Sequence, residues 1–212
     1  AQLRYVDTPA GQLHVAECGA GGPLVLLPWF PLSARLYDPE IPRWSADGWR
    51  TLAVDPLGFG RSGPRPPRFR VEQHADAIES ALATLGVREP VLLGGHFGAQ
   101  VALELASRAA VGARALVLDG GPLVAPDAVA AIRARLAQFP APGWQADGSH
   151  RTFLHDHAVA TYRIFDPGFE PDAARLPLVH RFVGDYLAAG MPVANDTPHD
   201  YPFAERLRAL QL

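Results

Sequence analysis

The feature that most constrains the fold is a strand-turn-helix pattern at residues 91–106. It opens with an apolar run, turns through Gly94-Gly95-His96-Phe97-Gly98, and continues in a stretch that favours a helix. Gly94 and Gly98 stand two positions on either side of His96, and only such small residues let a strand and the following helix approach closely. The pattern predicts a sharp turn with a strained His96 at its tip.

Further strands and helices alternate around this turn. Two alternating segments at 3–7 and 12–17 predict an antiparallel hairpin. Short apolar runs predict strands buried on both faces, and helical periodicity fills the intervals between them. The predicted strands are 23–27, 51–55, 90–94 and 115–119, and the predicted helices are 34–45, 71–85 and 99–109. This alternation predicts an α/β fold with a mostly parallel sheet and helices on both of its faces.

From residue 126 onward no further buried strand is visible. Helical segments are predicted at 127–138, 151–164, 171–189 and 199–210. We therefore expect residues 1–125 to form an α/β core, and residues 126–212 to form a helical cap packed across one end of the sheet.

Composition excludes several classes of chemistry. All nineteen basic residues of the 212 are arginine, so Schiff-base, pyridoxal-phosphate and Walker-A lysine chemistry are excluded. A net charge of −3 argues against nucleic-acid or anionic-membrane partners. The single Cys18 excludes an internal disulfide framework and a cysteine-based zinc site. We expect a cytoplasmic protein with a small-molecule partner and no metal or cofactor; the oligomeric state stays open.

Two motifs resemble those of the α/β-hydrolase superfamily. The sequence Gly94-x-His96-x-Gly98 is similar to the Gly-x-Ser-x-Gly nucleophile elbow of that superfamily, and residues 55–62 resemble its Asp-x-x-Gly-x-Gly-x-Ser segment. The resemblance runs from the first hairpin to the end of the chain. It implies a mostly parallel sheet with a helical cap, and it leaves the reaction open because this fold supports many activities.

The chain departs from the superfamily pattern at two places. His96 replaces the elbow serine, and Pro28-Trp29 replaces the usual His-Gly after the third strand. The resemblance implies that the backbone N–H groups of Phe30 and Phe97 form the oxyanion hole. Because Trp29, Phe30 and Phe97 flank this centre, we expect their side chains to contact an apolar or aromatic ligand.

The late acid and histidine of the superfamily's triad are not visible, since the chain stops where the seventh strand would begin. We expect either an incomplete chain or one that another polypeptide completes. Within the chain, Asp119 is the best candidate for the orienting acid, because it ends the predicted strand beside the elbow. The alternative is that Asp119 only caps a turn.

His96 has three possible roles. It could act as a general acid or base, as a nucleophile that forms an acyl-imidazole, or as polar lining in a non-catalytic protein. The first role fits proton-transfer chemistry, such as a lyase, a decarboxylase or carbon–carbon bond cleavage, better than an acyl-enzyme esterase. The leading hypothesis is a small-molecule enzyme of the superfamily acting on an apolar or carbonyl-containing substrate; the alternative is a hydrophobic-ligand binder.

The sequence His155-Asp156-His157 invites a metal hypothesis. On a helix, however, residues i and i+2 point to different faces, and no further ligand stands nearby. We therefore predict no metal site there.

Overall fold

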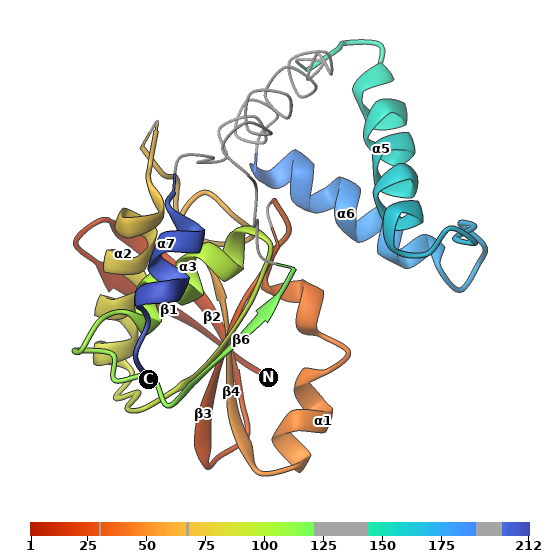
Figure 1. Cartoon of the computed structure of the whole chain (residues 1–212). Coiled ribbons are helices and arrows are strands. Elements are labelled where there is room, and N and C mark those ends of the chain that lie inside the picture. Colours follow the sequence, from red (N-terminus) through yellow and green to blue (C-terminus); the bar gives the residue numbers. More distant parts are fainter. Residues whose placement is uncertain (30, 67, 121–143, 190–200) are drawn as a thin grey trace.

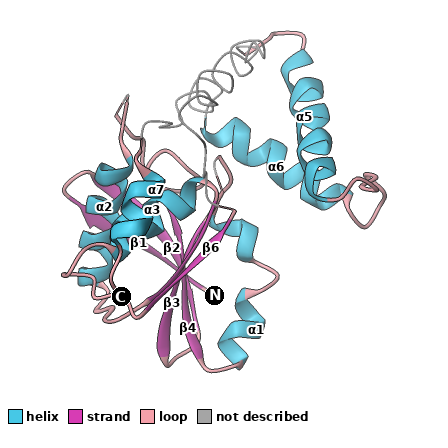
Figure 2. Ribbon diagram, viewed as in Figure 1, coloured by secondary structure: helices cyan, strands magenta, loops and turns pink. Residues whose placement is uncertain are grey.

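A computed structural model describes residues 1–29, 31–66, 68–120, 144–189 and 201–212. The described residues form a sheet of six strands in the order β1-β2-β4-β3-β5-β6 (Figures 1 and 2). These strands are β1 (Gln2–Thr8), β2 (Gly11–Cys18), β3 (Gly22–Leu27), β4 (Trp49–Asp55), β5 (Val91–Gly95) and β6 (Ala115–Asp119). The first hairpin is antiparallel, β2 is antiparallel to β4, and the remaining pairs are parallel. The predicted α/β class and the predicted strands are confirmed.

The central strands are buried on both faces because helices cover both sides of the sheet. In β3, Val25 and Leu27 pack in the core beneath α2 (Val71–Thr84) and α3 (Phe97–Ala106). Leu24 and Leu26 point to the opposite face, as the two-residue period of a strand requires. The continuous apolar runs of the sequence are thus explained by burial on two sides.

The structure corrects the burial expected for β6. Val117 at its centre is 46% exposed, although the sequence predicts a fully buried strand. The reason is position, because β6 is the edge of the described sheet and pairs there with β5 alone. An apolar run does not distinguish an edge strand from a central one.

The helix predicted at 34–45 is also wrong as a single element. The structure has a short 3-10 helix, η1 (Ala34–Tyr37), followed by α1 (Ile41–Ala46). Pro39 stands between them and lacks the N–H that a continuous helix needs. Pro42 is in the first turn of α1, where that missing donor costs nothing.

Two helices form a separate layer beyond the carboxyl ends of the parallel strands. They are α5 (Ser149–Phe165) and α6 (Leu176–Ala189), which pack against each other through Ala158, Val179 and Phe182 (Figure 1). The predictions at 151–164 and 171–189 are confirmed, although α6 begins later than expected. The prediction at 127–138 lies outside the described residues.

The last helix has a different neighbour. Helix α7 (Phe203–Ala209) packs against α3, and Phe203 and the preceding Tyr201 belong to the main core (Figure 1). Tyr201 also donates a hydrogen bond to the buried carboxylate of Glu104 at 3.1 Å. Residues 201–209 therefore return to the face of the sheet that α2 and α3 cover.

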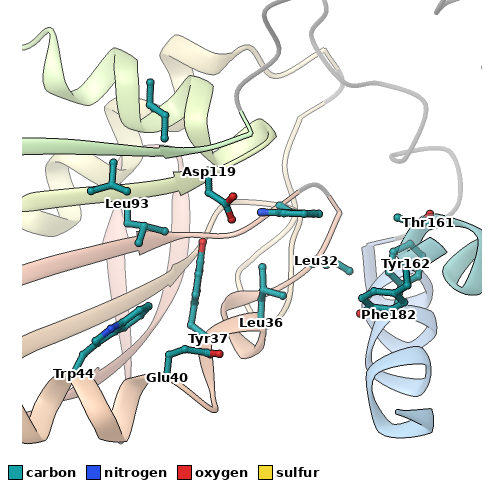
Figure 3. A pocket seen from close by; sticks show the side chains of 13 residues that line it. Leu32, Leu36, Tyr37, Glu40, Trp44, Leu93, Asp119, Thr161, Tyr162 and Phe182 are labelled. Carbon is teal, nitrogen blue, oxygen red and sulfur yellow. The ribbon is translucent and has the colours of Figure 1, made fainter. Parts of the chain in front are cut away.

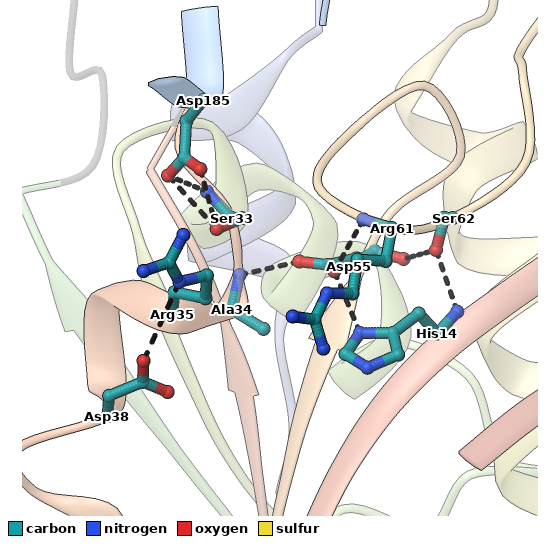
Figure 4. A network of polar contacts seen from close by, with 9 residues as sticks. All are labelled: His14, Ser33, Ala34, Arg35, Asp38, Asp55, Arg61, Ser62 and Asp185. Carbon is teal, nitrogen blue, oxygen red and sulfur yellow. Dashed lines mark hydrogen bonds and ion pairs between the residues drawn. The ribbon is translucent and has the colours of Figure 1, made fainter. Parts of the chain in front are cut away.

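A buried carboxylate ties α6 to the core. Asp185 accepts hydrogen bonds from the backbone N–H of Ser33 at 2.9 Å and from the Ser33 hydroxyl at 3.0 Å (Figure 4). Burial raises the pKa of Asp185, while these donors act in the opposite direction. This contact joins α6 to the segment that follows β3. Within the described chain, no helix has the length and apolar character that crossing a membrane requires.

Candidate active site at the strand ends

His96 occupies the tip of a tight turn between β5 and α3. Its φ of 49° and ψ of −108° lie outside the favoured regions for an L-residue, and its side chain is exposed. A Cβ on Gly94 would lie 2.2 Å from the carbonyl oxygen of Gly98, and one on Gly98 would lie 2.3 Å from that of Leu27. Both glycines are thus required by close backbone approach, and the predicted sharp turn is confirmed.

Asp119 lies beside this turn. It pairs in register with Gly95 across β5 and β6, and its carbonyl oxygen accepts a hydrogen bond from the His96 N–H at 3.1 Å. The carboxylate of Asp119 is exposed at the same end of the sheet and borders a cavity (Figure 3). The fold therefore brings the backbones of the histidine and the acid together, as their strand-end positions predict.

The Phe97 side chain points into the core. It is only 1% exposed, stacks on Phe59 with ring centroids 5.7 Å apart, and meets the edge of His74 at 5.2 Å. The Phe97 ring is therefore a core side chain and not the expected ligand contact, because packing between α2 and α3 encloses it. Phe30, the other expected oxyanion donor and ligand contact, lies outside the described residues.

Trp29 lies directly on the backbone of Gly95. A Cβ added to Gly95 would be 1.9 Å from both Cδ1 and Nε1 of the indole. The bulky residue that replaces the usual glycine after β3 therefore fits because the residue before the elbow tip has no side chain. Sequence reasoning missed this pairing; its only trace was Gly95, a glycine at a position where the Gly-x-His-x-Gly motif accepts any residue.

Asp55 organises the loops beneath the site without facing the cavity. Its buried carboxylate accepts hydrogen bonds from the Ala34 N–H at 2.6 Å, the Arg61 N–H at 3.0 Å, and His14 Nδ1 at 2.9 Å (Figure 4). The Ser62 hydroxyl donates to the Asp55 carbonyl oxygen at 2.5 Å. These contacts give Asp55 a structural role, whereas nothing in the sequence pointed to His14.

The two histidines of the His155-Asp156-His157 sequence make separate contacts. His155 Nδ1 lies 3.2 Å from the neighbouring Asp156 carboxylate at the surface. His157 Nε2 lies 3.1 Å from the hydroxyl of Tyr186 on α6, and burial lowers the pKa of His157. The latter histidine therefore takes part in packing α5 against α6.

A cavity of about 640 Å³ opens between the sheet, the η1–α1 segment and the α5–α6 layer (Figure 3). Its volume is in the range of small-molecule sites. Most of its described wall is aliphatic or aromatic, with a few polar groups. The wall consists of Trp29, Leu32, Leu36, Tyr37, Glu40, Trp44, Leu93, Val117, Leu118, Asp119, Thr161, Tyr162 and Phe182. Trp29 and Asp119 thus connect this cavity to the His96 turn.

The sheet order, the strained elbow and the cavity at the strand ends are the features of an α/β hydrolase fold. The family model described as alpha/beta hydrolase fold matches residues 22–159, so the chain belongs to the α/β hydrolase fold family.

Known relatives extend the comparison. The chain is 32% identical over 120 residues to a haloalkane dehalogenase of Mycobacterium marinum, covering 54% of this chain and 40% of that protein. The chain is similar to a hydrolase from Pseudomonas aeruginosa PA01, with a TM-score of 0.74, 19% identity, and coverage of 100% and 77%. It is also similar to an epoxide hydrolase from an endophytic Streptomyces, with a TM-score of 0.74 and 22% identity. That match covers 100% of this chain and 75% of the other. The matched segments span 34–41% of the lengths of the haloalkane dehalogenases.

Proposed function

We propose that this protein is a small-molecule hydrolase in which His96 acts as a general acid or base on an apolar or carbonyl-containing substrate. The observation that carries the proposal is the strained turn, which exposes the His96 side chain and joins its backbone to that of Asp119, a residue that borders an apolar cavity. Sheet packing requires no polar residue at this tip, and holding a non-glycine residue at positive φ costs free energy. Relatives named haloalkane dehalogenase and epoxide hydrolase support a hydrolytic reaction.

The proposed mechanism uses proton transfer instead of an acyl-enzyme. His96 would take a proton from a water molecule as that water attacks the substrate carbonyl, and would return the proton to the leaving group. The N–H groups of Phe97 and Phe30 would stabilise the developing oxyanion. Asp119 would orient the imidazole and stabilise its protonated form.

The second candidate function is a non-catalytic binding protein for hydrophobic ligands. It is favoured by one observation, namely that the described wall of the cavity is mostly apolar and does not include His96. On this alternative, the elbow would be retained only as a structural turn.

The test is turnover of a panel of nitrophenyl esters and β-keto acids by the parent protein and by His96→Ala. General acid–base catalysis predicts a loss of about 10²- to 10⁴-fold in kcat/KM. His155→Ala, which removes an exposed histidine from the cap, is the matched control and should retain full activity. Equal rates in the parent and His96→Ala would refute the role of His96. Ligand binding by the parent without turnover would favour the binding protein.

A further inference from the structure

The described wall of the cavity carries negative charge only. Of its 13 residues, Glu40 and Asp119 are acidic, and none is an arginine or a histidine. Within the described part of the chain, no hydrogen bond or ion pair joins either carboxylate side chain to another residue. Both carboxylates are therefore left to interact with solvent or with whatever enters the cavity.

The two carboxylates lie on either side of one aromatic ring. Tyr37 is buried and donates its hydroxyl hydrogen to the carbonyl oxygen of Leu27 at 2.9 Å. Figure 3 shows Asp119 near the hydroxyl end of Tyr37 and Glu40 near the opposite end. Burial raises the pKa of Tyr37, and the charges of Asp119 and Glu40 raise it further, so both charges act on the same small region.

Aromatic rings form much of the remaining wall. The rings of Tyr37 and Trp44 are 6.4 Å apart and tilted by 46°, and Trp44 is one helical turn beyond Glu40. On the cap side, the rings of Tyr162 and Phe182 lie 6.0 Å apart. The face of an aromatic ring attracts a cation, and a nearby carboxylate adds to that attraction.

We propose that this cavity binds a ligand with an alkylammonium or quaternary ammonium group on an apolar body. The cation would lie near Glu40, Tyr37 and Trp44, and the apolar body would extend along the wall toward Asp119 and the elbow. This inference rests on the proposed function in one respect, because it takes the cavity to be the substrate site.

Among the described residues, two arginines of the neighbouring segments are engaged outside the cavity. Arg181 on α6, whose charge acts on Tyr162, donates a hydrogen bond to the carbonyl oxygen of Arg35 at 2.7 Å. Nε of Arg35 lies 3.8 Å from Oδ2 of Asp38 at the surface (Figure 4). Neither arginine belongs to the cavity wall, so neither occupies the space proposed for the cation.

The test compares two probes of the same shape, choline and its uncharged isostere 3,3-dimethylbutan-1-ol, by calorimetric titration. We expect the parent protein to bind choline at least about tenfold more tightly than the alcohol. Glu40→Gln should weaken choline binding about three- to tenfold and leave binding of the alcohol unchanged. Asp38→Asn is the matched control, because it removes an acid two positions away that pairs with Arg35, and should bind choline like the parent.

The proposal is overturned if the parent binds neither probe, if both bind equally, or if Glu40→Gln and Asp38→Asn bind choline alike. Turnover of the ester panel, measured on the parent and on His96→Ala, separates this inference from the proposed function. A parent protein that prefers choline but turns over no substrate of the panel supports the cation site and refutes the proposed hydrolase. Turnover that depends on His96, in a parent without a choline preference, refutes the cation site alone.

Discussion

His74 on α2 makes the stability of this protein sensitive to acid. The imidazole is 2% exposed and is surrounded by the rings of Phe59, Phe69 and Phe97, with centroids 4.7–6.0 Å away. Its Nδ1 has no hydrogen-bond partner among the described residues. Burial, with a contribution from the charge of Arg65, lowers the pKa of His74 to about 3. The folded protein therefore holds this histidine neutral.

The size of the effect follows from the difference between the folded and unfolded pKa values. The unfolded chain binds a proton on His74 below its ordinary pKa of about 6.5, whereas the folded protein binds it only near pH 3. Above pH 6.5, His74 therefore does not reduce the free energy of unfolding. Below pH 6.5, it lowers that free energy by about 1.4 kcal/mol per pH unit. At pH 5, protonation of this one group in the unfolded chain lowers the free energy of unfolding by about 2 kcal/mol.

The assay is urea denaturation of the parent and His74→Leu at pH 7.5 and pH 5.0. His74→Leu keeps an apolar side chain of similar size in the ring cluster, and it should lose about 2 kcal/mol less than the parent between the two pH values. His155→Leu, at an exposed position, should keep the pH dependence of the parent. Equal losses in the parent and His74→Leu would show that His74 is not held neutral by burial.

Two further predictions concern packing around the site. Gly95→Ala should cost about 1–3 kcal/mol because the new methyl group meets the Trp29 indole, and adding Trp29→Ala should restore most of that loss in a double-mutant cycle. If the second substitution restores nothing, the contact is not the cause. Asp185→Ala leaves Ser33 without its buried acceptor at a cost of about 1–3 kcal/mol. It should therefore speed proteolysis within α5 and α6, whereas the exposed Glu170→Ala should not; equal cleavage of both variants would contradict this.

Local sterics explain why much of the fold was predictable. Gly94 is an example, because a Cβ added to it would lie 2.2 Å from a carbonyl oxygen, and this requirement for glycine is visible in the sequence beside the strand and helix that it joins. The hairpin and the central strands were predictable for a similar reason, since alternating or continuous apolar runs reflect burial on one or two faces. The break in the 34–45 helix was missed, although Pro39 is a local cause, because the apolar spacing on both sides suggested continuity.

Much of the site depends on contacts between distant segments. His14 meets Asp55 across 41 residues, and Ser33 meets Asp185 across 152. The cavity similarly gathers Glu40, from the segment after β3, and Asp119, from the end of β6. Periodicity indicates which face of an element is buried, but it carries no information about which distant residue lies opposite.

The sequence by itself determined the α/β class, the sharp turn at His96, and the position of Asp119 at a neighbouring strand end. Each of these follows from backbone sterics or from the pairing of adjacent strands. Only the tertiary structure decided that Phe97 is a core side chain and that Trp29 covers Gly95. It also decided that carboxylates and aromatic rings share one cavity. The physical reason is that side-chain environments depend on how the layers pack, and close packing joins residues that no local pattern relates.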